Sequence, residues 1–303
     1  MKILVTGSTG LVGTALTGAL LREGHTVCRL VRPESAASVQ GGGEIAVKWN
    51  PATGEMEGSA AGADAVVNLA GASIASGRWN AARKSLLLSS RVNATRQLVG
   101  ALGRLNPAPK VLVSAAATGY YGNRGDNVLT EESAPGDGFL AELARDWEAE
   151  AARAEALGMR VARLRFGVIL AKRGGALPQM MLPFRLGAGG RIGSGRQWMS
   201  WLTLDDAVAM IRFALENEAA RGALNAVAPQ AVRNAEFTRA LAKALHRPAI
   251  FPAPAFALRL ALGEMADALL LSSQRVVPQK LQQMGYRFVH PELAGALEEV
   301  LRK

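Results

Sequence analysis

The first thirteen residues, MKILVTGSTGLVG (residues 1–13), decide the fold. They begin with an apolar stretch that predicts a short β-strand, continue through Gly7, Gly10 and Gly13, and lead into the helical run 14–21. Glycines permit a tight turn and close backbone approach, and a helix N-terminus presents unpaired N–H groups with a partial positive charge. This order predicts a site for a dinucleotide pyrophosphate. The alternative is an ordinary glycine-rich turn between a strand and a helix.

Strand and helix patterns alternate through the first half of the chain. Strands are expected at 3–6, 26–31, 45–49, 65–69, 110–114 and 160–164, and helices at 14–23, 81–102 and 137–157. Such alternation predicts an α/β fold, a Rossmann-type doubly wound parallel sheet with helices on both faces. We expect a Rossmann domain over residues 1–168, to which 199–227 returns, and a smaller, mainly helical C-terminal lobe within 169–303.

Bulk composition narrows the class of protein. The 303 residues are 49% hydrophobic and 20% charged, and no apolar run reaches the roughly 18 residues of a membrane span. The single cysteine, Cys28, excludes an internal disulfide and fits a reducing compartment, and no secretory leader is evident, so a cytoplasmic location is expected. The net charge of +10 favours anionic ligands, but the basic residues are scattered and predict no specific nucleic-acid site. No metal-ligand spacing is present.

The end of the second strand indicates which dinucleotide is bound. NAD-dependent enzymes usually place an acidic residue there to bind the ribose hydroxyls, but this strand ends at Val31 and Arg32. The planar guanidinium of arginine suits a phosphate, so we predict that Arg32 binds the 2′-phosphate of NADP(H). The alternative is a surface arginine that closes a strand.

Three motifs together resemble the extended, epimerase-like branch of the short-chain dehydrogenase/reductase superfamily. They are TGSTGLVG (6–13), NLAGA (68–72) and SAAATGYYG (114–122). The resemblance implies that the backbone of residues 69–71 passes the adenosine half of the cofactor; simple strand-end packing is the alternative. The expected cofactor-binding residues are Gly7, Ser8, Thr9, Gly10, Leu11, Val12, Gly13, Val31, Arg32, Leu69, Ala70, Gly71, Arg91 and Val168.

A finer resemblance covers nearly the whole chain. Segments 76–99, 164–177, 183–201 and 263–288 are similar to the sugar-nucleotide-epimerase-like family 39U, an atypical member group with a C-terminal extension. This resemblance implies an NADP(H)-binding oxidoreductase or epimerase that acts on a small molecule. It leaves the substrate and the oligomeric state open.

The same resemblance exposes a departure from the superfamily. Its hydride-transferring members use Tyr-x-x-x-Lys and a nearby Ser, with the tyrosine as acid/base and the lysine lowering its pKa. The resemblance places Leu140, Ala144 and Ala117 at these three positions, and none can transfer a proton. Arg91 stands where the superfamily has an asparagine, and it can replace the missing positive charge near a cofactor phosphate or ribose. An exposed helix arginine is the alternative.

Other residues are candidates to replace the missing acid/base groups and to bind the substrate. Tyr121 and Thr118 follow the fifth strand, at the sheet edge where active sites gather in this architecture, although packing beneath the cofactor is the alternative for the tyrosines. The segment 193–201, GSGRQWMSW, predicts a pocket floor that stacks a planar ligand and pairs with an anion, or a loop that fills the gap between lobes. The expected substrate-pocket residues are Tyr120, Arg185, Arg196 and Trp198.

Two functions follow from these observations. One is an NADP-dependent oxidoreductase or epimerase of atypical mechanism, favoured by the chemically rich segment 193–201. The other is a catalytically silent NADP(H)-binding sensor or scaffold, favoured by Leu140 and Ala144 at the catalytic positions.

Overall fold

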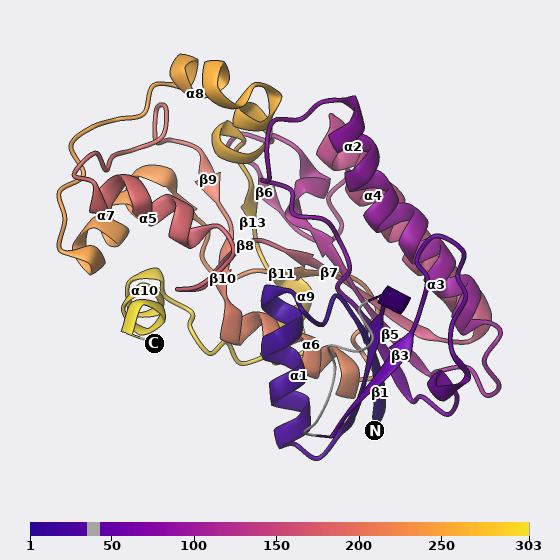
Figure 1. The fold of residues 1–303 in the computed structure, drawn as a ribbon. Helices are drawn as coiled ribbons and strands as arrows, with labels where there is room; N and C mark the ends of the chain where they lie inside the picture. Colours follow the sequence, from indigo (N-terminus) through magenta and orange to yellow (C-terminus); the bar gives the residue numbers. More distant parts are fainter. Residues whose placement is uncertain (35–42, 303) are drawn as a thin grey trace.

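A seven-stranded parallel sheet forms the centre of the computed structural model, which describes residues 1–34 and 43–302 (Figure 1). The strand order is β11-β7-β5-β4-β1-β2-β3, so the winding direction reverses between β1 and β4. The strands are β1 (Lys2–Thr6), β2 (Thr26–Val31), β3 (Glu44–Lys48), β4 (Ala65–Asn68), β5 (Val111–Ala117), β7 (Arg160–Phe166) and β11 (Gly222–Ala226). Ligands of open α/β sheets bind at such a reversal, outside the carboxyl ends of the strands. The predicted fold class is confirmed.

Two apolar layers hold the helices against this sheet. Successive strand side chains point to opposite faces, so Ile3 and Leu4 enter different cores. The Ile3 face is covered by α1 (Leu11–Arg22) and α6 (Leu204–Glu216), and the Leu4 face by α3 (Ala94–Leu102) and α4 (Phe139–Ala152). Both faces of the sheet are therefore covered by helices and shielded from water, which explains why the sequences of β1 and β4 are almost continuously apolar.

The helix expected at 81–102 contains an irregular turn. It consists of α2 (Ala81–Leu88), a π-helical turn at Ser89–Asn93 and α3. Such π turns are rare and occur often at functional sites. Arg91 lies within this turn.

The C-terminal lobe combines helices with short strands. Its helices are α5 (Leu177–Arg185), α7 (Asn234–Leu245), α8 (Ala255–Leu262), α9 (Gln279–Gln283) and α10 (Leu293–Arg302). Three two-stranded sheets join β10 (Trp201–Thr203) to β8 (Val168–Leu170), β12 (Val232–Arg233) to β9 (Trp198–Met199), and β13 (Arg275–Val276) to β6 (Val128–Leu129). The predicted mainly helical character is confirmed. Most of these short strands were not predicted, because two residues are too few for an alternating pattern.

The C-terminal lobe also reaches across to α2, beside which α8 lies in Figure 1. Arg78 donates to the carbonyl oxygen of Leu260 at 3.0 Å, and Lys84 pairs with Glu264 at 2.6 Å. No helix in residues 1–34 and 43–302 has the length and apolar character needed to cross a bilayer.

Candidate functional site at the carboxyl edge of the sheet

The turn after β1 fits only glycine at two positions. Gly7 has a positive φ of 64°, and a Cβ added there would lie 2.6 Å from the carbonyl oxygen of Leu69. A Cβ on Gly13 would lie 2.2 Å from the carbonyl oxygen of Gly7. Both distances are far below van der Waals contact, so the glycines let the turn lie directly against the chain after β4 and against its own helix.

Helix α1 begins at this turn with unpaired donors. Gly10 is its N-cap and supplies no side-chain cap, and its first turn, which includes Leu11 and Val12, contains no acidic residue. The orphan N–H groups and the helix dipole therefore favour an anion at this end. Thr9 precedes the cap and is exposed to solvent.

A buried polar network fixes the chain after β4. The hydroxyl of Thr6 accepts hydrogen bonds from the backbone N–H groups of Leu69 and Ala70, at 3.0 and 3.2 Å, and donates to Asn68 at 2.7 Å. The Asn68 amide in turn donates to Thr95 of α3 at 2.9 Å. These bonds satisfy polar groups that are removed from water, and they hold the backbone of residues 69 and 70 beside the glycine turn.

The second strand contributes two arginines with different surroundings. Arg32 follows Val31 at the end of β2, with 67% of its side chain exposed and Glu34 at 3.5 Å. Arg29 lies within β2, where its Nε donates to the Ser8 hydroxyl at 3.1 Å and its Nη1 to Glu44 at 2.8 Å. Arg29 is one of the basic residues that look scattered along the sequence. The signal that sequence reasoning missed is a charged residue inside a strand that is otherwise largely buried.

The third arginine, Arg91, lies against the loop after β4. Its guanidinium carbon is 3.0 Å from the position of a Cβ on Gly71, and Nη2 donates to the Ala72 carbonyl at 2.9 Å. The guanidinium also lies over the ring of Trp147, at 5.3 Å. Burial, and to a lesser degree the charge of Arg83, lowers the pKa of Arg91 to about 10. Arg91 is thus turned inward to this loop, unlike an exposed helix arginine.

Tyr121 has no access to solvent. Its hydroxyl donates to Asn225 at 2.6 Å and accepts from Nη1 of Arg165 at 2.8 Å. Burial raises the pKa of Tyr121 to about 12. Arg165 forms a bidentate buried pair with Glu148, at 2.6 and 2.9 Å, and lies 3.5 Å from the centre of the Tyr120 ring. This geometry favours the packing interpretation of both tyrosines over proton transfer or ligand contact.

The three residues that the resemblance places at the standard catalytic positions have apolar side chains. Ala144 is buried, and Leu140 lies beside Gly119, whose added Cβ would be 3.5 Å from that of Leu140. Ala117 ends β5, and Thr118 starts the short 3-10 turn that follows, with 7% exposure. Thr118 therefore lies at the carboxyl edge of the sheet.

The C-terminal lobe does not bring the expected pocket residues together. The guanidinium carbons of Arg233 and Arg275 lie 4.4 and 4.6 Å from the centre of the Trp198 ring, and its N–H donates to Asp126 at 2.9 Å. The side chains of Arg185 and Arg196 are solvent-exposed, and no contact in the described part of the chain joins them. Trp198 thus packs against other groups of the protein. This favours the alternative in which segment 193–201 is a loop that fills the gap between the lobes.

Val168 begins β8 next to Gly167. Its N–H donates to the Ser200 carbonyl at 2.8 Å, and a Cβ on Gly167 would lie 2.5 Å from that oxygen. Glycine is therefore required for the close approach between the end of β7 and the chain before β10.

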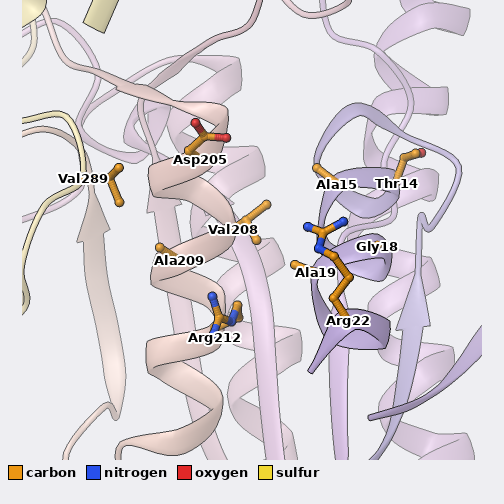
Figure 2. Close-up of a pocket in the computed structure, with 10 residues that line it drawn as sticks. All are labelled: Thr14, Ala15, Gly18, Ala19, Arg22, Asp205, Val208, Ala209, Arg212 and Val289. Atoms are coloured by element: carbon orange, nitrogen blue, oxygen red, sulfur yellow. The ribbon is translucent and has the colours of Figure 1, made fainter. Parts of the chain in front are cut away.

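A separate groove of about 390 Å³ lies between α1 and α6 (Figure 2). Arg22 enters it from α1 and Arg212 from α6, and most of the other lining side chains are small or apolar. None of the expected cofactor-binding residues is among those that line it.

A cluster of possible metal ligands lies nearby. Glu23, His25 and Glu216 place ligand-type atoms within 4.8 Å of one another, but both glutamates are exposed and Glu23 already pairs with Arg212. Neither the groove between α1 and α6 nor this cluster belongs to the carboxyl edge of the sheet.

Comparison with known proteins places this geometry in a family. Residues 3–226 match the model of the NAD dependent epimerase/dehydratase family. The chain is a member of this family. Residues 253–300 match a domain of unknown function, DUF1731.

Individual members of the epimerase family are similar over nearly their whole length. Epimerase family protein Mb2239 of Mycobacterium bovis is 42% identical over 97% of this chain and 96% of its own length. Epimerase family protein SDR39U1 of Bos taurus is 39% identical over 99% of this chain and all of its own. The crystal structure of human SDR39U1 with NADPH has a TM-score of 0.86 and 35% identity, and the match covers 100% of this chain and 99% of that one. The resemblance to family 39U is thus confirmed.

Proposed function

We propose that this protein binds NADPH along the carboxyl edge of the sheet and acts as an oxidoreductase or epimerase of atypical mechanism on a small molecule. The observation that carries the proposal is the turn in which Gly7 and Gly13 leave no room for a side chain in front of the uncapped N-terminus of α1. The human relative crystallised with NADPH supports the same cofactor. A cytoplasmic location and the domain limit at residue 168 remain predictions.

Each group of residues has a role in this proposal. The backbone N–H groups of residues 7–13 bind the pyrophosphate, and Arg32 binds the 2′-phosphate because its guanidinium, on a side chain that is 67% exposed, lies at the end of β2. Residues 69–71 and Val31 line the adenosine half. Arg91 supplies positive charge farther along the edge, where Val168 closes the site.

The protein's own contribution to chemistry is limited. NADPH, when bound, supplies a hydride. Leu140 and Ala144 cannot hold or move a proton, and the hydroxyl of Tyr121 is buried and bonded on both sides. Thr118, at the end of β5, is the hydroxyl that remains for orienting a substrate, and the proton then comes from solvent or from the substrate itself.

A second candidate function is a cofactor-bound protein without turnover. The apolar side chains at Ala117, Leu140 and Ala144 favour it, because a catalyst of this superfamily depends on polar groups there. The protein then serves as a sensor or scaffold that responds to the NADPH pool.

Calorimetric titration with NADPH and with NADH tests the cofactor assignment. Wild type is expected to prefer NADPH, and Arg32→Gln to lose at least about tenfold of that preference, since a charge-assisted hydrogen bond contributes roughly 1.5–3 kcal/mol. Arg145→Gln, which removes an exposed arginine on α4, is the control. Equal NADPH affinity in Arg32→Gln and wild type contradicts the role of Arg32, and no binding by wild type contradicts the proposal.

Turnover separates the two candidate functions. The protein is incubated with NADPH and a panel of carbonyl compounds and nucleotide sugars, and loss of the reduced-nicotinamide absorbance is followed. Sustained loss with any substrate supports the enzyme and excludes the silent sensor. Binding of NADPH without turnover across the panel favours the sensor.

A further inference from the structure

A second arginine, Arg83, faces the same loop as Arg91. Arg83 lies in the first turn of α2, and its Nη2 donates to the carbonyl oxygen of Ser73. Arg91 donates to the adjacent carbonyl, that of Ala72, and the N–H of Ala72 donates to the Ser90 hydroxyl at 3.1 Å. The loop 71–74 is therefore held by two guanidinium groups, one hydroxyl and the indole N–H of Trp79, which donates to the Ile74 carbonyl at 2.9 Å.

Each of the two guanidinium groups keeps a donor without a partner. Nε of Arg83 and Nη1 of Arg91 are buried and have no hydrogen-bond acceptor among the described residues. A buried donor without an acceptor costs about 1–3 kcal/mol, and more when it is charged. Two such donors beside one loop indicate an acceptor other than the described residues, which a bound ligand would supply.

The charges of this pair are also uncompensated. In residues 1–34 and 43–302, no carboxylate lies within ion-pair distance of Arg83 or Arg91. The nearby Glu264 pairs with Lys84. The charge of Arg83 lowers the pKa of Arg91, so the two cations repel each other. An anion placed between them would remove this repulsion and satisfy the free donors at the same time.

The local backbone is shaped to produce this arrangement. Arg91 lies in the π-helical turn Ser89–Asn93, where one extra residue per turn changes the direction in which a side chain points. Gly71 leaves room for the guanidinium, because a Cβ there would lie 3.0–3.3 Å from its atoms. Trp147 provides a flat apolar surface under the guanidinium.

We infer that Arg83 and Arg91, with the loop 71–74, form a binding site for the oxyanion group of a ligand, a phosphate or a carboxylate. The site deepens the proposed function, since it lies at the same edge of the sheet as the glycine turn. The oxyanion comes either from the cofactor, as one of its phosphates, or from the second substrate, as an acidic group. In the second case the substrate class is an anionic small molecule.

Calorimetry with three probes tests the site and distinguishes the two sources. NADPH is titrated into the free protein, and inorganic phosphate and succinate are titrated into both the free and the NADPH-saturated protein. The variants are Arg83→Met and Arg91→Met, with Arg83→Lys to retain the charge. Arg104→Met is the matched control, because Arg104 also donates to a backbone carbonyl, that of Gly54, but away from this edge.

If a cofactor phosphate occupies the site, both Met variants lose about tenfold or more of NADPH affinity. If an acidic substrate occupies it, NADPH affinity stays within about twofold, while phosphate and succinate binding to the NADPH-saturated protein is lost in both variants. In either case Arg83→Lys retains more binding than Arg83→Met. Circular dichroism melting confirms that each variant is folded before it is titrated.

The inference is overturned if both folded Met variants bind all three probes as wild type and Arg104→Met do. It is also overturned if wild type shows no phosphate or succinate binding and the Met variants bind NADPH normally. If wild type does not bind NADPH but binds phosphate through Arg83 and Arg91, the proposed function fails while the oxyanion site stands. Failure of one is therefore distinguishable from failure of the other.

Discussion

The Nε–H of Arg29 donates a hydrogen bond to the hydroxyl of Ser8, at 3.1 Å, from beneath the glycine turn. A guanidinium can only donate, so the Ser8 oxygen is the acceptor and its own hydrogen stays available to an anion. The same guanidinium pairs with Glu44 at 2.8 Å and neutralises a carboxylate close to the cofactor edge. Arg29 is therefore a positioning residue for the glycine turn.

Removing Arg29 is expected to weaken NADPH binding. Arg29→Leu leaves the carboxylate of Glu44 uncompensated near the turn, and its charge repels the phosphates of the cofactor. We expect a loss of about fivefold or more in NADPH affinity, measured by calorimetry, with partial recovery in Arg29→Leu/Glu44→Gln. An equally weak double variant would show that the bond to Ser8, not the charge of Glu44, is responsible.

Replacing Gly13 by alanine is expected to disrupt the turn. A Cβ there lies 2.2 Å from the carbonyl oxygen of Gly7, so the helix and the turn must separate. Overpacking of this kind costs about 1–3 kcal/mol, measured as a lower free energy of unfolding in urea, and NADPH binding should be lost. Gly18→Ala is the matched control in the same helix, because its nearest neighbour is a flexible arginine tip at 3.5 Å. If Gly13→Ala and Gly18→Ala behave alike, the close approach is not required.

Tyr121→Phe is expected to affect stability and leave cofactor binding intact. Loss of the hydroxyl removes an acceptor from Arg165 and a donor from Asn225 in a buried site, at a cost of about 1–3 kcal/mol in unfolding free energy. NADPH affinity should stay within about twofold of wild type. A variant with unchanged stability that loses turnover would restore Tyr121 as a catalytic residue.

The tyrosines provide a pH test of the same network. Burial raises the pKa of Tyr121 to about 12 and, with the charge of Asp206, raises that of Tyr286 above its ordinary value. Ionisation is thus harder in the folded than in the unfolded chain, so this contribution to stability is complete below about pH 10 and is lost as the pH rises toward 12. Ultraviolet titration of the folded protein at about pH 11 should show that Tyr121 and Tyr286 are still largely protonated. Full ionisation before unfolding contradicts this prediction.

Breaking the buried pair of Arg165 and Glu148 should be the most damaging single change. Arg165→Met removes the bidentate partner of Glu148, whose side chain is 4% exposed, and leaves that carboxylate with Arg163 at 3.9 Å. Removing one partner of a buried charge pair costs about 3–5 kcal/mol in unfolding free energy. Arg153→Met, which removes an exposed partner of Glu150, should cost less than about 1 kcal/mol. Urea denaturation measures both, and similar losses would contradict the difference in burial.

Sequence patterns predicted the features that depend on near neighbours. The turn at Gly7–Gly13 and the apolar strands are local signals, so the parallel strands of the sheet and the glycine turn after β1 were expected at the right residues. The π turn at Ser89–Asn93 was not expected, because a single inserted residue leaves the apolar period of the helix nearly unchanged.

Partnerships between distant residues were not predictable from the chain alone. Tyr121 and Asn225 are 104 positions apart, and only the assembled fold shows that their side chains bond. Arg29 and Arg83 looked like dispersed surface charge, since nothing near them in sequence marks Ser8 or the loop after β4 as a partner. Composition gives the amount of charge, and the topology of the sheet determines where that charge converges.

Strand β13 pairs with β6, and β11 pairs with β7. Each lobe therefore consists of segments that are far apart in the sequence. A fragment that ends after β7 would expose the backbone of that strand as a bare sheet edge, and unprotected edges invite self-association. The C-terminal extension is therefore not a separable structural unit. We expect the extension to fold together with β6, with which its strand β13 pairs, so that exchange between relatives involves the entire polypeptide.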